Sequence, residues 1–527
     1  MRNLFLPGRS PTLARDAAVA TSHPLATSAA LAILADGGNA VDAAIAAVAV
    51  QCVVEPHMTG IAGDCFAIYA PAGGAPVALN GSGRAPAGAS VARLTDAGLT
   101  EIPQASPHAV TVPGAISAWT TLHGDHGRLP LERVFAAAID YAENGYPVTA
   151  RVAADWALAE RLLNGNEGAK AILLPGGRAP RFGERHSQPR LGARLREVAA
   201  GGAAAFYTGA TARAMVAALS ALGGVHTEED FANGADTAVY VDPIGMNYRG
   251  YEVLECPPNG QGVVALLILN ILSQFDLGPD VPLAERIHIH AEATKQAYHH
   301  RDELLGDPAG MDDLVERLLS PARAQALAAR IQPGRAGPAS LWDEPEHKDT
   351  VYLCVVDGDG NAVSFINSLF HGFGSGIMDP ETGVLFHSRG ASFRLIEGHP
   401  NALMPGRRPM HTIIPAMLRR EGRTVMPFGV MGGHYQAAGQ AAFLSGMLDQ
   451  GLDVQAAMDA PRAFAFGGKL QVEPTVDDAT RETLRQWGHA VDVVKTPIGG
   501  SQAIWIDRAG VLLAGSDQRK DGLALGF

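Results

Sequence analysis

The feature that most constrains the fold is an abrupt change of composition at Thr350. Residues 331–349 are rich in proline, glycine and acidic side chains, which is the composition of a linker. From Thr350 onward two apolar strand patterns, 350–356 and 362–369, flank the run Asp-Gly-Asp-Gly-Asn at 357–361. That run is a strong signal for a β-hairpin. The chain therefore divides into two unequal parts, 1–349 and 350–527, and the second is rich in strands.

Two alanine-rich helices are predicted near the start of the first part. Residues 24–35 form one, stopped by Gly37 and Gly38, and Asn39 then caps a second helix with Asp42 in the capping-box position. Two closely joined helices of this composition need a flat surface to pack on, most naturally a sheet. Strands are also predicted at 65–70, 76–79 and 251–255, and helices at 263–272 and 283–305.

Composition and charge exclude several classes of partner. The net charge is -13, and no basic run with interleaved aromatic residues occurs, so a nucleic-acid partner is not expected. Residues 1–26 lack the apolar core of a secretory signal, and the apolar stretch 43–54 is shorter than the roughly 20 residues of a membrane span. The four cysteines, which form no CxxC pair, are interpreted as buried free thiols. These features predict a cytoplasmic protein that acts on small molecules without a membrane partner.

Thr350 carries the chemical hypothesis. A threonine that becomes a chain terminus offers a hydroxyl nucleophile and an adjacent free amine to act as its base. Amide hydrolysis also needs donors for the developing oxyanion, and Gly432 and Gly433 would let backbone amides approach a ligand closely. Both features have plainer interpretations, since threonine suits any strand and paired glycines often form a turn.

Several motifs, in order along the chain, support the chemical interpretation. They are Gly-Gly-Asn-Ala-Val-Asp-Ala-Ala at 37–44, Val-Pro-Gly at 112–114, Val-Val-Asp-Gly-Asp-Gly-Asn-Ala-Val at 355–363, Phe-Gly-Ser-Gly-Ile at 373–377, Arg-Pro at 408–409 and Gly-Ser-Asp-Gln-Arg at 515–519. With these motifs the chain resembles, over nearly its full length, the γ-glutamyltransferase family of N-terminal-nucleophile hydrolases.

The resemblance implies an α+β fold, a four-layer αββα sandwich, and self-cleavage between Asp349 and Thr350. The large chain 1–349 and the small chain 350–527 would stay together as a heterodimer in one structural domain, and a dimer of heterodimers is left open. Thr350 Oγ would attack the substrate amide with its new α-amine as base, and no metal or cofactor is implied. The family's other site positions fall on Ser368 as second hydroxyl, His411 and Thr412 near the substrate carboxylate, and Gly432 and Gly433 at the oxyanion.

The chain departs from the family where the substrate's α-amino-acid group would bind. Residues 387–393 read His-Ser-Arg-Gly-Ala-Ser-Phe in place of a run of amides and acids, so carboxylates are missing and Arg389 is present. Ser82 occupies the position of the usual carboxylate-binding arginine, with Arg84 two residues later, and Phe370 replaces an asparagine. A guanidinium repels an ammonium group but grips a carboxylate.

The predicted substrate is therefore an amide of a small acyl group that carries a carboxylate without an α-ammonium, held by Arg389 and Arg84. This pattern is more similar to the family's branch of acylases and oxamate amidohydrolases. The alternatives are a true γ-glutamyltransferase or glutathione hydrolase, and an uncleaved relative that binds ligands without catalysis. Arg389 could also serve only an internal salt bridge.

One further cluster suggests a metal site. On a helix over 283–305, His288, Glu292, Lys295 and His299 would share one face. A lysine inside a divalent-cation site is a poor ligand and a repelling charge, so an ordinary charged helix is the favoured interpretation.

Overall fold

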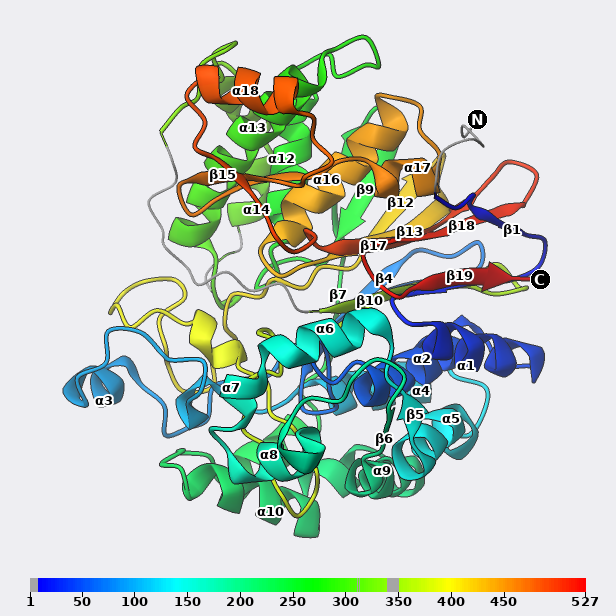
Figure 1. Ribbon diagram of the computed structural model, residues 1–527, viewed down its shortest axis with the longest axis vertical. Helices are drawn as coiled ribbons and strands as arrows, with labels where there is room; N and C mark the ends of the chain where they lie inside the picture. The colour runs from blue at the N-terminus through cyan, green and yellow to red at the C-terminus, as the bar shows by residue number, and fades with distance from the viewer. Residues whose placement is uncertain (1–7, 310, 312, 339–349) are drawn as a thin grey trace.

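Two seven-stranded antiparallel sheets lie face to face at the centre of the computed structural model, which describes residues 8–309, 311, 313–338 and 350–527 (Figure 1). The first sheet has the order β1 (Thr12–Ala14), β18 (Leu512–Ser516), β17 (Gly500–Ile506), β13 (Arg423–Met431), β12 (Ala416–Arg420), β9 (Tyr251–Glu255), β8 (Ile244–Tyr248). The second has the order β19 (Leu523–Gly526), β2 (Ala18–Thr21), β10 (Val351–Val356), β11 (Ala362–Ser368), β3 (Asp64–Ala70), β4 (Val77–Gly81), β7 (Val239–Val241).

Helices cover the outer face of each sheet. On the second sheet pack α1 (Pro24–Ala35), α2 (Ala40–Val54) and α4 (Ala115–His126), and α5 (Leu131–Asn144) and α9 (Pro189–Tyr207) pack behind these helices. On the first sheet pack α12 (Gly262–Leu272), α16 (Tyr435–Leu448) and α17 (Val454–Asp459), and α13 (Leu283–Leu304), α14 (Leu314–Leu319) and α15 (Pro321–Ala328) pack against α12. The predicted αββα sandwich is confirmed.

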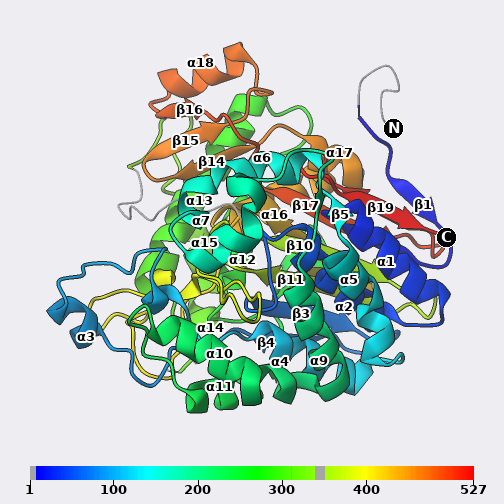
Figure 2. The ribbon, with the colours of Figure 1, turned by 60° about the horizontal axis from the view of Figure 1, so that its bottom comes forward.

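Smaller elements surround this frame. A three-stranded sheet, β14 (Ala463–Phe466), β15 (Lys469–Val472) and β16 (Val491–Val493), lies with α18 (Asp478–Gln486) at the outer end of α13 (Figure 2). The remaining helices are α3 (Val91–Asp96), α6 (Ala150–Leu158), α7 (Glu160–Leu163), α8 (Glu167–Leu173), α10 (Gly209–Ser220) and α11 (Glu228–Gly234). Short pieces complete the described chain: β5 (Tyr146–Pro147), β6 (Arg185–His186), η1 (Pro107–Ala109), η2 (Pro175–Gly177) and η3 (Arg389–Ser392).

The alanine-rich pair α1 and α2 forms as predicted. Asn39 and Asp42 make the reciprocal capping box, and every residue of α2 is buried because the helix packs between β10 and α5. Small side chains on nearly every side let the helix approach the sheet closely. The four cysteines are free and buried, as predicted. No helix within the described residues is long and apolar enough to cross a membrane.

The two parts of the chain on either side of Thr350 are interleaved in both sheets. In the second sheet, β10 and β11 from the later part lie between β2 and β3 from the earlier part. The hairpin turn is fixed locally, because the Asp357 carboxylate accepts hydrogen bonds from the backbone amides of Asp359 and Asn361. All six residues of β10 are buried, since one face packs on the first sheet and the other on α2.

Candidate active site

Thr350, Ser368 and Asp64 lie at the same end of three adjacent strands. Val351 pairs with Asn367 across the hairpin, which puts Thr350 beside Ser368, and Ser368 pairs in turn with Asp64 on β3. The hydroxyl oxygens of Thr350 and Ser368 are 3.2 Å apart, and all three side chains are buried. The hairpin register therefore brings two hydroxyls and a carboxylate into one row across the sheet.

The facing sheet contributes Gly432 and Gly433 directly after β13. Both have positive φ, 127° and 57°, and a Cβ on Gly432 would come 2.9 Å from the Cα of Gly499, so the loop needs glycine at that position. Gln261, at the start of α12, fixes the loop because its amide donates to the carbonyl oxygens of Gly433 and Thr412, at 3.2 and 2.8 Å.

Gln436 connects this loop to Thr350. It lies in the first turn of α16, is fully buried, and its Nε2 donates to Thr350 Oγ1 at 3.3 Å. Its other amide atom, Oε1, accepts a hydrogen bond from the backbone N–H of Ile414 at 3.1 Å, which fixes the orientation of the amide. The Thr350 hydroxyl is thus held between Ser368 on its own sheet and Gln436 on the opposite helix.

Asp64 is the centre of a buried polar cluster. Its Oδ2 lies 2.9 Å from His411 Nε2 and 3.3 Å from His387 Nδ1, and its Oδ1 accepts the backbone N–H of Gly83 at 2.8 Å. Burial alone would raise the pKa of this carboxyl, but the two histidines hold it well below its usual range. Burial and the charge of Arg389 lower the pKa of His411 to about 3, so His411 is neutral and donates its Nε2–H to an ionised Asp64.

Arg389 completes the cluster and is fully buried. Its Nη1 donates to Thr412 Oγ1 at 3.1 Å, and its Nε lies 3.9 Å from Asp64 Oδ2, too far for a hydrogen bond. Nε and Nη2 have no hydrogen-bond partner among the residues that the structure describes. Burial, opposed by Asp64, lowers the pKa of Arg389 to about 9, which still leaves the guanidinium charged at neutral pH.

Phe370 joins Arg389 to the hydroxyl pair. Its ring lies under the Arg389 guanidinium at 3.9 Å, and its backbone N–H donates to Ser368 Oγ at 2.9 Å. The residue has a φ of 79°, an unfavourable conformation for a bulky side chain that costs on the order of 1 to 3 kcal/mol. The surrounding contacts hold this strained residue between the arginine and the nucleophile candidate.

Comparisons with known proteins identify the family. A model of the gamma-glutamyltranspeptidase family matches residues 26–527. The chain belongs to the γ-glutamyltranspeptidase family. It is 39% identical to the glutathione hydrolase-like YwrD proenzyme of Bacillus subtilis, over 97% of this chain and 98% of that protein. It is 37% identical to the oxamate amidohydrolase proenzyme of Klebsiella pneumoniae, over 96% and 97% of the two chains.

A solved structure gives the same result for the fold. The chain superposes on cephalosporin acylase from Bacillus halodurans with a TM-score of 0.93 and 39% identity, covering 100% of this chain and 98% of that one. These likenesses confirm the predicted resemblance and make the chain a self-processing amidohydrolase of the γ-glutamyltranspeptidase family.

Most residues expected to form the family's site meet in the structure. Thr350, Ser368, Gly432, Gly433, Arg389, His411 and Thr412 all lie in the region described above. Arg84 does not join the buried cluster: it is exposed, and its Nη1 donates to the carbonyl oxygen of Gly406 at 3.0 Å. Asp349, the expected residue before the cleavage point, lies outside the described residues.

His411 and Thr412 both bond to other residues of the buried cluster. His411 Nε2 forms a hydrogen bond with the Asp64 carboxylate, and the Thr412 hydroxyl accepts one from Arg389. Ser82, at the position of the family's usual arginine, lies beside a different arginine, Arg408. Arg408 donates hydrogen bonds to the carbonyl oxygen of Ser82 and, at 2.5 Å, to the carbonyl oxygen of Thr237. Arg408 is therefore engaged by backbone carbonyls, whereas Arg389 keeps two nitrogens without a hydrogen bond.

Sequence reasoning missed Asp64 and Gln436. The signal for Asp64 was present, because an acidic residue begins the apolar run Cys65–Ala70, and a buried carboxylate requires partners. Gln436 gave no comparable signal. Nothing in an alanine-rich helix marks one glutamine as the residue that reaches Thr350.

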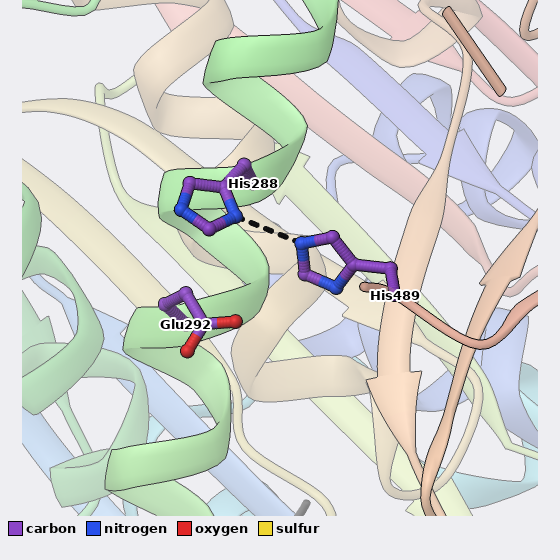
Figure 3. A group of neighbouring side chains, drawn as sticks. All are labelled: His288, Glu292 and His489. Carbon is purple, nitrogen blue, oxygen red and sulfur yellow. Dashed lines mark hydrogen bonds between the residues drawn. The ribbon is translucent and has the colours of Figure 1, made fainter. Parts of the chain in front are cut away.

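The suspected metal ligands on α13 form a different arrangement from the predicted one (Figure 3). His288 and Glu292 are joined by His489, which precedes β16, whereas His299 lies in a separate exposed group. The ring nitrogens His288 Nδ1 and His489 Nε2 are 2.8 Å apart, a direct hydrogen bond, and His288 Nε2 bonds to the carbonyl oxygen of Gln332 at 2.9 Å. Glu292 forms a 2.6 Å ion pair with Lys295 and accepts the backbone N–H of Gly337. These side chains are held by each other and by backbone groups, the arrangement of a structural network.

Proposed function

We propose that this amidohydrolase cleaves the amide of a small acyl group that carries a carboxylate and no neighbouring ammonium, and that Arg389 binds this carboxylate. The observation that carries the proposal is the pair of buried nitrogens, Nε and Nη2 of Arg389, for which the described residues offer no hydrogen-bond partner. These nitrogens form one edge of the guanidinium, and two parallel N–H donors match the two oxygens of a carboxylate. Buried donors that stay unpaired are costly, so a ligand that pairs them gains affinity.

The electrostatics around Arg389 favour an anion over a cation. Asp64 is the nearest carboxylate, but it already bonds to His411 and to the backbone N–H of Gly83, and His387 Nδ1 lies 3.3 Å from its Oδ2. An α-ammonium group, as in a γ-glutamyl substrate, would face the guanidinium, and the sequence 387–393 offers it no acidic residue. The name of the Klebsiella relative, oxamate amidohydrolase, agrees with a carboxylate-bearing amide.

The reaction follows from the position of Thr350. After cleavage of the 349–350 bond, the free α-amine of Thr350 would take the proton from its Oγ, which attacks the amide carbonyl carbon. The backbone amides of the Gly432–Gly433 loop would stabilise the oxyanion, and the C–N bond breaks as the amine leaves with a proton. Water then attacks the threonine ester and releases the free acid, which restores the hydroxyl.

The two chains produced by cleavage, 1–349 and 350–527, would remain a heterodimer. Both large sheets contain strands from both parts, so separation would break their ladders and expose the cores. The relatives named proenzymes support this processing.

The first experiment tests the cleavage point. We expect purified protein to give chains of about 36 and about 19 kDa, the shares of 55.0 kDa that fall to residues 1–349 and 350–527, with Thr350 at the new N-terminus. Thr350→Ala should stay a single chain, whereas Thr350→Ser, which keeps a hydroxyl, should still be cleaved. A small chain that begins at another residue, or an intact wild-type chain with full activity, would refute the assignment.

The second experiment tests the substrate on the cleaved enzyme. We expect kcat/KM to be higher for a glutaryl anilide than for the γ-glutamyl and butyryl anilides, and we expect turnover of oxamate to depend on Arg389. Arg389→Met should lower kcat/KM for the glutaryl compound by about 100-fold, because a charge-assisted pair is lost, and should affect the butyryl compound much less.

Arg84→Met is the matched control, because Arg84 is exposed and bonds to Gly406. Its effect on the glutaryl compound should stay within about 3-fold. A preference for the γ-glutamyl anilide that survives Arg389→Met would instead establish the alternative, a glutathione hydrolase or γ-glutamyltransferase.

A further inference from the structure

A cavity of about 570 Å³ lies in the helical layer over the first sheet, bounded by α13, α16 and α17. None of the residues that face Thr350 or Arg389 lines it. Its volume is in the range of small-molecule binding sites, which are mostly apolar with a few placed polar groups. The apolar part of the wall comes from Leu283, Ile287, Ala291, Ala438, Phe443 and Leu452.

Arg286 on α13 is a charged group of this wall for which the described residues provide no partner. Its side chain is half-buried, its Nε is fully buried with no hydrogen bond, and it forms no ion pair within the described residues. Burial lowers the pKa of the guanidinium. A buried N–H donor without an acceptor is uncommon in folded proteins and indicates a missing partner.

His290 lies one helical turn after Arg286 on the same side of α13, and it also lines the cavity. Burial lowers the pKa of its imidazole to about 4, so the ring is neutral at pH 7 and can donate one N–H. It has no hydrogen bond to any residue that the structure describes. The two side chains thus provide adjacent donors on one wall.

The other charged side chains that line the cavity already form hydrogen bonds with protein groups. Arg462 donates to Ser501 and Ile498, and Arg9 donates to the carbonyl oxygen of Gly522. Asp459 accepts from Gln455 at 3.0 Å, and Asp453 caps α17. Both acids belong to α17 or its N-cap, whereas the unpaired positive charge, Arg286, belongs to α13. An apolar occupant between the two helices would separate Arg286 from these acids.

We propose that this cavity binds a small organic monocarboxylate with an apolar body, its carboxylate on Arg286 and His290 and its body against α13 and α16. A single unpaired cation suits one carboxylate, and the alanine, leucine and phenylalanine side chains suit a hydrocarbon or aromatic body. The inference concerns a second site and stands whatever the amide substrate is.

The cavity is linked to the catalytic region through one helix turn. Tyr435 lines the cavity and is the first residue of α16, directly after the Gly432–His434 loop and directly before Gln436, which bonds to Thr350. An occupant that packs against Tyr435 therefore stiffens the helix end that positions the nucleophile.

The test uses 4-(4-bromophenyl)butyrate as the probe and its uncharged primary amide as the control ligand, with calorimetry and thermal unfolding on the cleaved enzyme. We expect the acid to bind and to raise Tm, and the amide to bind at least about 10-fold more weakly. Arg286→Gln should weaken binding of the acid by at least about 10-fold, whereas Arg213→Gln, an exposed arginine on α10, should leave it unchanged.

Two further measurements locate the probe. Ala456→Phe, which fills the cavity from α17, should abolish binding even if Arg286→Gln proves unstable, and crystals should show the bromine signal between α13 and α16. Binding that is lost in Arg389→Met but kept in Arg286→Gln and Ala456→Phe would assign the carboxylate to the catalytic region and overturn the proposal. Equal binding of acid and amide, or no binding at millimolar probe, would overturn it as well.

Discussion

Two buried polar clusters of this protein look alike in composition but differ in how completely their hydrogen bonds are made. The cluster around Asp64 contains two histidines and Arg389, and two nitrogens of that arginine have no hydrogen-bond partner in the described part of the chain. The cluster on α13 contains His288 and His489, which bond to each other, and the Glu292–Lys295 ion pair. Both side chains of the pair also bond to the backbone of Gly337, and Glu292 Oε1 is held by the ion pair alone.

The completeness of the hydrogen bonds separates a ligand-binding cluster from a structural one. A network whose donors and acceptors are used up by protein groups stabilises the fold, and opening it for a ligand would break existing bonds. A buried cation with an unused pair of donors gains from a ligand instead. Composition alone would have ranked the α13 cluster higher, because histidines and glutamate are typical metal ligands.

The largest effect is expected from Asp64→Asn, which removes the only acid bonded within the catalytic cluster as described and leaves Arg389 buried without a countercharge. Breaking a buried charge network from one side costs about 3 to 5 kcal/mol of unfolding free energy. Urea denaturation of the Thr350→Ala precursor would measure it without interference from cleavage.

The control is Asp36→Asn, which removes a surface ion pair with Arg133 and should cost about 1 kcal/mol or less. The pH dependence supplies a second check. Because the pKa of Asp64 is lower in the folded than in the unfolded chain, its stabilisation is present above about pH 4 and is lost as the pH falls below that value. The stability gap between wild type and Asp64→Asn should therefore narrow in acid, and a constant gap would mean that Asp64 is not ionised in the fold.

A smaller effect is expected from Gln436→Leu, which removes the donor to Thr350 Oγ1 while keeping most of the side-chain volume. The hydroxyl would lose one of its positioning contacts, so kcat should fall by about 10-fold with KM little changed. Gln440→Leu is the matched control, because Gln440 lies one turn further along α16 and bonds only to Ile414 in the described structure. If both variants lost the same activity, the effect would come from helix packing and not from Thr350.

The smallest effect is expected in the α13 cluster. His489→Ala breaks the imidazole pair and should lower the unfolding free energy by about 1 to 2 kcal/mol, while kcat/KM on the preferred amide stays within about 2-fold of wild type. A chelator should change neither quantity. Loss of activity with the chelator, restored by added zinc, would show that this network is a metal centre and that the α13 cluster, too, binds a ligand.

Local sequence was sufficient for the elements that depend on neighbours in the chain. The capping box at Asn39 and Asp42, the helix at residues 24–35 and the hairpin at 357–361 occur as predicted, because each is fixed by contacts within a few residues. The hairpin also fixed the pairing of Thr350 with Ser368, since the turn sets the register of both strands.

The sequence predicted only part of the candidate site. Thr350, Ser368 and the glycine pair follow from motifs, whereas Arg84 was expected beside the substrate and is exposed. Its position near Ser82 in the chain could not show that Arg408, from a distant segment, fills the buried space next to Ser82. Gln436 was missed for the same reason, because its contact with Thr350 crosses from one sheet layer to the other.

Sequence alone was enough for the hairpin that begins at Thr350, the hydroxyl pair and the membership of a hydrolase family, because these depend on local patterns and on motifs in a fixed order. Only the tertiary structure decided which charges meet. Asp64, His387, Arg389 and His411 come from both sides of the cleavage point, and their hydrogen bonds depend on how two sheets face each other. Burial then raised the cost of leaving the Arg389 donors unpaired, because buried N–H groups cannot bond to bulk water.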